Sequence, residues 1–241
     1  MRTRIVQLLL FFSLVSCGEL QQVINQLPEG SRAIGEAQIA AALQEALDQG
    51  IDRQVVQLAA ENGFYGNPRY RILLPEPLRK VDKTLRDLGM GNLADEGIML
   101  LNRAAEDAVG TATPVFVDAV RQITFTDARN ILLGPEDAAT DYLQSKTRMA
   151  LYGRFSPIIE DSFRKVGAGQ VWEELISRYN RLPLVEPVNP DLTDYVTGEA
   201  LKGVYRAIAS EEARIRNSIP ARSTDLMRRV FALQDSYREG R

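Results

Sequence analysis

Apolar residues recur every three or four positions over most of the chain from residue 35 onward, and glycine, proline and short polar stretches separate these runs. Such spacing is typical of amphipathic helices, which bury one apolar face. Ile39, Leu43 and Leu47 line a first helix that ends at Gly50, and a second, short helix covers 51–62. Further helices are predicted at 77–88, 93–109, 113–122, 126–133, 135–151, 154–166, 169–180, 193–217 and 223–237.

The pattern therefore predicts an all-α fold, a single multi-helix domain with short loops that spans residues 35–241. Residues that favour helix ends support several boundaries. Thr126 is suited to cap the helix at 126–133, and Gly134 follows the end of that helix. Pro135 then opens the next helix, at a position where the missing backbone N–H is tolerated.

Two segments depart from the helical pattern. Phe64 to Pro77 contains three prolines around the extended-looking run Tyr70-Arg71-Ile72-Leu73-Leu74, which is either a short strand or a crossing loop. Leu182 to Pro187 is the other extended candidate. Because prolines restrict such pieces to the edge of a sheet, at most one minor extended ribbon is expected.

The N-terminus carries an export signal. Arg2 and Arg4 precede an apolar run from Ile5 to Val15, which is too short to span the ~30 Å hydrocarbon core of a bilayer. The run ends in Leu14-Val15-Ser16-Cys17, which resembles a bacterial lipobox. The resemblance implies cleavage before Cys17 and attachment of diacylglycerol to its thiol. The alternatives are an ordinary signal peptide with an incidental cysteine, or a chain that is never exported.

The lipobox reading divides the chain into a signal peptide at 1–16, a lipidated tether at 17–34 and the helical domain at 35–241. Several acyl chains, palmitate among them, hold a protein far more firmly than one chain does. The membrane is thus an expected partner through Cys17. Gly18 follows the cysteine where an aspartate would favour the inner membrane, so the expected location is the outer membrane, facing the periplasm.

Composition excludes several kinds of chemistry. The chain has no histidine and a single cysteine, Cys17. The lack of histidine excludes catalysis by Ser-His-Asp or Cys-His groups and histidine metal sites. With Cys17 acylated, zinc ribbons and thiol redox chemistry are excluded as well, and no cofactor is expected. The 29 Lys and Arg include the two arginines of segment 1–16, which leaves 27 against 32 acidic residues and a net charge of −5. This balance gives no support to nucleic-acid binding.

Charged and amide residues interrupt the apolar faces of three predicted helices. Lys146 falls within the face of 135–151 that Ala139, Leu143 and Ala150 mark, and a buried ammonium requires a partner. We therefore predict an ion pair between Lys146 and at least one nearby carboxylate. The candidate cluster, which is either structural or a binding site, consists of Asn102, Glu106, Asp127, Lys146, Glu211, Glu212 and Arg216.

Two interpretations of this cluster stay open. The structural one is an internal ion-pair network that fixes helix packing, in which Glu212 and Arg216 form a simple i,i+4 helix salt bridge. The functional one is a polar pocket for a small ligand or cation, built from Asn102, Glu106, Lys146 and Glu212. Arg222, Arg228 and Arg229 are interpreted as an exposed face, which anionic lipid headgroups would also attract.

Several stretches resemble a bacterial lipoprotein family known only as domain of unknown function 4197. They are Asn102-Arg103-Ala104-Ala105-Glu106, Phe125-Thr126-Asp127-Ala128-Arg129, Asp137-Ala138-Ala139-Thr140-Asp141-Tyr142, Asn189-Pro190-Asp191-Leu192-Thr193-Asp194-Tyr195-Val196, Glu211-Glu212, Ile215-Arg216 and Arg222-Ser223-Thr224-Asp225-Leu226. The resemblance implies an all-α, exported protein of bacteria with a Gram-negative type of envelope. It implies no activity and no catalytic residue.

The sequence thus favours a membrane-anchored lipoprotein whose helical body is a non-enzymatic binding or scaffold module for an envelope protein or a small ligand. The alternative is an envelope hydrolase that works through carboxylates and Lys146. Glycoside cleavage by two carboxylates requires them to face a cleft about 5 to 9.5 Å apart. Glu106 and Glu212 are the first pair to examine for that geometry.

Overall fold

Helices account for all the regular secondary structure that the computed structural model describes, which covers residues 34–87, 91–165, 176–177, 180–181, 187 and 192–239. Within these ranges no residue lies in a strand, and the predicted all-α fold is confirmed. The elements are α2 (Glu36–Ala59), α3 (Glu76–Asp87), α4 (Gly91–Val109), α5 (Thr113–Arg121), α6 (Phe125–Leu133), α7 (Ala138–Lys165), α9 (Leu192–Asn217), the 3₁₀ helix η3 (Ile219–Ala221) and α10 (Asp225–Glu239).

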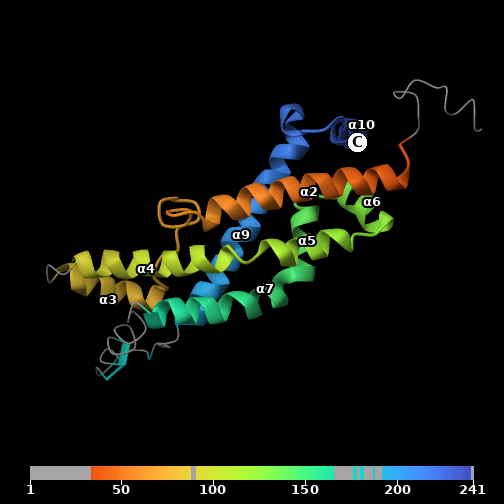
Figure 1. Cartoon of the computed structure of the whole chain (residues 1–241). Helices are drawn as coiled ribbons and strands as arrows, with labels where there is room; N and C mark the ends of the chain where they lie inside the picture. Colours follow the sequence, from red (N-terminus) through yellow and green to blue (C-terminus); the bar gives the residue numbers. More distant parts are fainter. Residues whose placement is uncertain are drawn as a thin grey trace, which may run out of the picture. The chain divides into compact units, whose positions relative to one another are not determined.

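The helices form one unit, Glu36–Arg241, whose centre is the antiparallel pair of α7 and α9. α2 crosses α9 and also packs against α4, α5, α6 and α10, while α3 returns along α4 (Figure 1). Apolar side chains from these helices fill the interior, with Phe116 meeting Tyr205 edge-on at a ring-centroid distance of 6.0 Å.

The first helix does not end at Gly50 as the sequence predicts. α2 continues to Ala59 as one helix, so the expected short helix at 51–62 is its second half. Gly50 is buried, and a Cβ at this position would lie 3.3 Å from the Glu211 side chain. The glycine therefore permits the close approach of α2 and α9 rather than ending a helix. Gly203 does the same for Phe64, whose ring lies 2.6 Å from the position of a Cβ.

α7 joins two helices that the sequence separates at residues 151–154. It runs through Pro157, which normally breaks a helix by removing one backbone hydrogen bond. Buried residues nevertheless repeat every four positions across the proline, at Leu151, Phe155, Ile159 and Phe163. Packing of this row against neighbouring helices outweighs the local cost, as tertiary contacts often do.

α6 begins one residue earlier than predicted, and its cap is Thr124 rather than Thr126. The Thr124 hydroxyl accepts a hydrogen bond from the Asp127 backbone N–H at 3.1 Å, and the Asp127 carboxylate accepts one from the Thr124 N–H at 3.1 Å. This reciprocal arrangement is a capping box. Hydrogen bonds from Thr124 hold the pKa of Asp127 below its usual range.

The predicted extended run at 70–74 is a crossing loop. Its residues have no regular secondary structure apart from a turn at Tyr70, yet Ile72 and Leu74 are buried. The other half of the suggested ribbon, most of the predicted helix at 169–180, the signal peptide and Cys17 lie outside the described residues.

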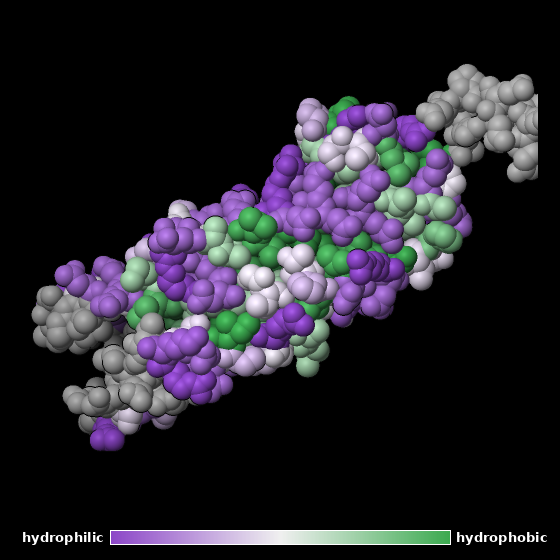
Figure 2. Space-filling view, in the orientation of Figure 1, coloured by the Kyte–Doolittle hydropathy of each residue, from purple (hydrophilic) through white to green (hydrophobic). Residues whose placement is uncertain are grey.

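None of the described helices is both long and apolar enough to cross a bilayer. On the face that Figure 2 shows, hydrophobic residues gather in a narrow strip between α2 and the α4–α5 helices, with hydrophilic residues on either side.

The two candidate caps of α6 make the N-terminus of this helix testable. Thr124→Ala should lower the free energy of unfolding by about 1 kcal/mol, because it removes the acceptor for the Asp127 N–H. Thr126→Ala changes an exposed residue inside the helix and should change that free energy by less than about 0.5 kcal/mol. Urea unfolding of both variants measures the difference, and a larger loss in Thr126→Ala would contradict the assignment.

Candidate functional site

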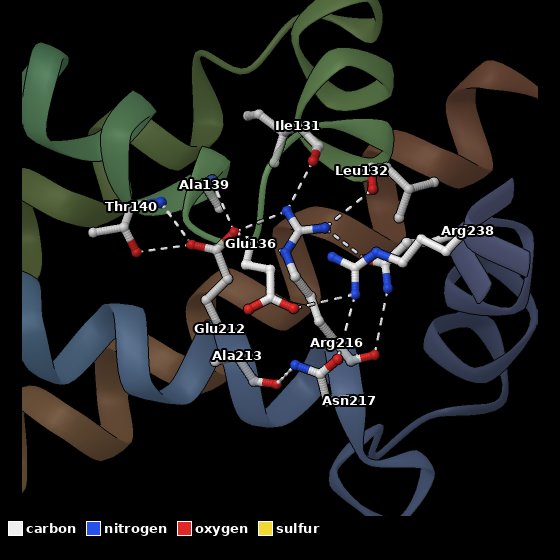
Figure 3. A network of polar contacts seen from close by, with 11 residues as sticks. Ile131, Leu132, Glu136, Ala139, Thr140, Glu212, Ala213, Arg216, Asn217 and Arg238 are labelled. Atoms are coloured by element: carbon white, nitrogen blue, oxygen red, sulfur yellow. Dashed lines mark hydrogen bonds and ion pairs between the residues drawn. The ribbon is translucent and has the colours of Figure 1, made fainter. Parts of the chain in front are cut away.

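Glu212 and Arg216 on α9 form a buried ion pair. Both side chains point from α9 into the junction between α6 and α7 (Figure 3). Their residues are 8% and 2% exposed. The Arg216 Nε and Nη2 atoms donate to one Glu212 oxygen at 2.9 and 2.8 Å. The predicted i,i+4 pair is therefore present, but it lies in the core rather than on a helix surface.

Each member of this pair satisfies the end of another helix. Glu212 accepts hydrogen bonds from the backbone N–H groups of Ala139 (2.9 Å) and Thr140 (2.8 Å), in the first turn of α7. Arg216 donates to the carbonyls of Ile131 (2.8 Å) and Leu132 (3.0 Å), in the last turn of α6. The carboxylate thus meets a positive helix end and the guanidinium a negative one, which is the favourable arrangement for both helix dipoles.

Arg222 caps the end of α9 in a similar way. Contrary to the expectation of an exposed face, its side chain is buried and donates to the carbonyls of Ile215 (3.1 Å) and Arg216 (2.9 Å). An ion pair with Asp235 on α10 at 2.7 Å neutralises its charge. Gln234 on the same helix accepts a hydrogen bond from Arg216 at 2.6 Å, so α10 is tied to both arginines.

Glu106 and Asn102 hold the loop after α2 against α4. The buried Glu106 carboxylate accepts hydrogen bonds from the N–H groups of Phe64 (3.0 Å) and Tyr65 (3.1 Å), besides an ion pair with Arg103 at 2.7 Å. Asn102 accepts from the Ile72 N–H at 2.8 Å and donates to the Ile72 carbonyl at 2.9 Å. The amide therefore supplies the two bonds that a neighbouring strand would give.

Glu211 joins α9 to α2. Its carboxylate accepts from Arg53 at 3.1 Å and from the Arg214 Nε at 2.8 Å. Burial alone would raise the pKa of Glu211, but the hydrogen bond and charge of Arg214, together with the charge of Arg53, outweigh it and lower that pKa. Glu211 is thus an ionised, structural carboxylate.

The prediction of an ion pair at Lys146 is wrong. Lys146 is exposed, its ammonium lies 5.6 Å from the centre of the Tyr142 ring, and it pairs with no carboxylate among the residues that the structure describes. The buried face of α7 passes through Thr147, whose hydroxyl lies 2.8 Å from that of Tyr205, so the expected face is displaced by one residue. Asp127, likewise, is a helix cap and contacts none of the buried acids.

The candidate residues consequently form separate structural contacts instead of one pocket. Glu106 and Glu212 are both buried, bind different segments and have their oxygens occupied by protein donors. The cavity beside Glu211, Glu212 and Arg216 has a volume of about 20 Å³, room for a single water. Over the described ranges, no three acidic side chains converge as a metal site would require.

A larger groove lies between α7 and α9, with a volume of about 580 Å³. Its lining comes from one side of each helix: Asp137, Thr140, Asp141, Gln144, Arg148, Tyr152, Asp194, Tyr195, Gly198, Glu199, Leu201, Lys202, Tyr205, Arg206 and Ala209. Sequence reasoning missed this groove. The polar residues of α7 at i, i+3 and i+7 lie along the groove, but any exposed helix face has the same pattern and so does not indicate a groove.

Charges in the groove differ from those in the core because several are unpaired. Lys202 pairs with Glu199 at 2.6 Å, and Asp194 accepts a hydrogen bond from the Tyr152 hydroxyl at 2.6 Å. By contrast, four charged side chains of the groove form no ion pair and no side-chain hydrogen bond with another described residue. These are Asp137, Asp141, Arg148 and Arg206.

A family model described as "Protein of unknown function (DUF4197)" matches residues 33–232. The chain belongs to this family. The match confirms the resemblance seen in the sequence, and it covers both the Glu212–Arg216 pair and the α7–α9 groove. No curated protein and no solved structure matches the chain.

Loss of Arg216 should destabilise this DUF4197 protein strongly. Arg216→Met leaves Glu212 buried without its counter-ion and leaves the last carbonyls of α6 without donors, which should cost about 3–5 kcal/mol of unfolding free energy. Lys202→Met, on the same helix, removes an exposed ion pair with Glu199 and should cost about 1 kcal/mol or less. Guanidinium unfolding compares the two variants, and equal losses would contradict the structural role of the pair.

Proposed function

We propose that the protein is an exported lipoprotein, held at the membrane of the bacterial envelope by acyl chains on Cys17, and that its helical body is a non-enzymatic binding module. The binding face in this proposal is the α7–α9 groove. The observation that carries it is a contrast between two sets of charges: those in the core are paired, whereas Asp141, Arg148 and Arg206 in the groove have no ion-pair partner among the residues that the structure describes.

Two features support the anchor. The N-terminus combines a positive start, a short apolar run and Leu14-Val15-Ser16-Cys17 with the only cysteine of the chain. A lipid is also the simplest attachment for a body in which no described helix has the character of a membrane span. Gly18 after the cysteine favours the outer membrane, with the body in the periplasm.

Binding is a better match than hydrolysis to the described side chains. A hydrolase of the proposed alternative kind needs two carboxylates that face a cleft, but Glu106 and Glu212 are buried and accept hydrogen bonds from the chain itself. Lys146, the other catalytic candidate, is exposed on α7 and lines neither the groove nor the small core cavity. The groove offers tyrosine rings, amides and charges of both signs, which suit reversible recognition.

The anchor is tested by metabolic labelling with radioactive palmitate in the bacterium that makes the protein. The wild-type chain should incorporate the label and sediment with membranes. Cys17→Ser should lose the label and the membrane association, because it removes the thiol that receives the lipid. Ser16→Ala keeps a small residue before the cut and serves as the control, with labelling retained. Labelled Cys17→Ser protein, or unprocessed wild-type protein in the cytosol, would contradict the anchor.

Binding in the groove is tested by placing a photo-crosslinking residue at Gln144 in cells. We expect an adduct at this position and none at Met149, which is 81% exposed on the same helix and does not line the groove. Gly198→Leu should abolish the adduct, since it adds a side chain to the groove wall where no heavy atom lies within 4 Å.

Gly153→Leu is the matched control for that experiment. It makes the same change at an equally open position of α7 that does not line the groove, and it should leave the adduct intact. Replacing glycine in a helix is expected to stabilise the fold, so a lost adduct in Gly198→Leu would not reflect unfolding. Equal crosslinking at both probe positions, or no effect of Gly198→Leu, would contradict the groove as the binding face.

A further inference from the structure

The unpaired charges of the α7–α9 groove are segregated along its length. Asp137 directly precedes α7 and Asp141 lies in its first turn, whereas Arg148 lies two helical turns further along. α9 runs antiparallel to α7, as the contacts of Thr140 with Glu212 and of Thr147 with Tyr205 establish. The groove therefore has an acidic end and a basic middle.

The basic middle has two walls. Arg148 on α7 and Arg206 on α9 both line the groove, and neither has a carboxylate partner among the described residues. Lys202 nearby is already paired with Glu199, so its charge is neutralised. Two guanidiniums from opposite helices suit an anionic group between them, because each can donate several hydrogen bonds to a carboxylate.

The acidic end argues against a simple anion as the ligand. Asp137 and Asp141 repel a free anion that enters the groove, whereas they attract a cation with the same strength. Seven residues separate Asp141 from Arg148, so their positions on α7 are about 10 Å apart along the helix axis. The occupant that complements the acidic end and the basic middle carries a positive and a negative group at about this separation.

An extended peptide meets this requirement. In the polyproline II form of an extended chain, which repeats every three residues, side chains three apart lie on the same face and are separated by about 9 Å. The groove from Asp137 to Tyr152 is about 22 Å long, enough for about six such residues. The Gln144 amide, which lines the same wall, is placed to meet backbone amides of the peptide. A zwitterionic lipid headgroup separates its charges by only a few bonds and is too short.

We propose, on the basis of the binding function inferred above, that the α7–α9 groove binds an extended peptide segment with a cationic and an anionic side chain three residues apart. The cation lies over Asp137 and Asp141, and the anion lies between Arg148 and Arg206. Tyr205 and Leu201 supply the apolar contact beneath the peptide.

The probe is a fluorescent hexapeptide with acetylated and amidated ends, in which Lys and Glu are three positions apart. Anisotropy titration of the folded, full chain in detergent should give saturable binding that weakens with added salt. Peptides with Gln in place of either charged residue should bind at least tenfold more weakly. Equal affinity for the Lys/Glu peptide and the Gln-substituted peptides, or no saturable binding of any peptide, would overturn the proposal.

Variants of the groove test which residues contact the anionic and the cationic side chain of the peptide. Arg148→Gln should weaken binding of the Lys/Glu peptide about tenfold, whereas Arg129→Gln, at an exposed arginine of α6 outside the groove, should leave it unchanged. Asp141→Arg should invert the preference, so that a peptide with two Glu residues binds more tightly than the Lys/Glu peptide. A purely structural role of Asp141 would weaken both peptides equally and would overturn the assignment.

The proposal and the binding function fail in different ways. If the adduct at Gln144 in cells is a lipid or a glycan and the Lys/Glu peptide does not bind, the groove is a binding face but its ligand is not a peptide. If Gly198→Leu leaves the adduct unchanged, the groove itself is not the binding face. Circular dichroism of every variant confirms that each is folded before binding is measured.

Discussion

The hydrogen-bonded ion pair between Glu212 and Arg216 is the interaction on which the centre of the fold depends. It stands where two helix ends enter the interior, and the groups exposed at those ends cannot reach water. A buried backbone group without a partner costs about 1–3 kcal/mol, so the four groups that the pair satisfies would otherwise oppose folding. The pair also balances its own charges, so its burial adds no net charge to the core.

The same constraint explains the other polar residues of the core. Glu106 and Asn102 accept hydrogen bonds from backbone N–H groups of the loop that follows α2. Arg222 donates to backbone carbonyls at the end of α9. Glu106 and Asn102 thereby complete the backbone of a segment at least 30 residues away, whereas Arg222 reaches back six and seven residues to the end of α9. Short loops leave little room for local caps, and these long-range caps take their place. Among the described residues, the buried acids are occupied by contacts within the chain, whereas Asp141, Arg148 and Arg206 in the groove are not.

Sequence periodicity was sufficient for the fold class and for most helix ends, because the apolar stripes and the end-favouring residues are local signals. It failed where tertiary packing overrides local preference, as at Gly50 and Pro157. The predicted buried face of α7 was one residue off, so that it included Lys146. The residue actually buried there is the polar Thr147, whose hydroxyl forms a hydrogen bond with that of Tyr205. The apolar faces of α4 and α9 did single out Asn102, Glu106 and Glu211 as polar intruders. Their partners in these contacts are 30 to 158 residues away, beyond the reach of a local sequence pattern.

The α7–α9 groove could not be found in this way, since its residues look like an ordinary exposed face until α7 and α9 are placed side by side. Membership of the DUF4197 family adds no activity to this picture. Charges that satisfy one another hold the chain together, and the groove charges that lack such partners among the described residues are the basis of the proposed binding.

Amide hydrogen exchange at Ala139 and Thr140, followed by NMR in the native protein, tests the central role of the Glu212–Arg216 pair most directly. Amides in the first turn of a helix normally lack a partner and exchange quickly. If Glu212 holds them as described, they should exchange only through opening of the whole domain, with protection close to that of the centre of α9. Exchange at the rate of an exposed first-turn amide would contradict the account.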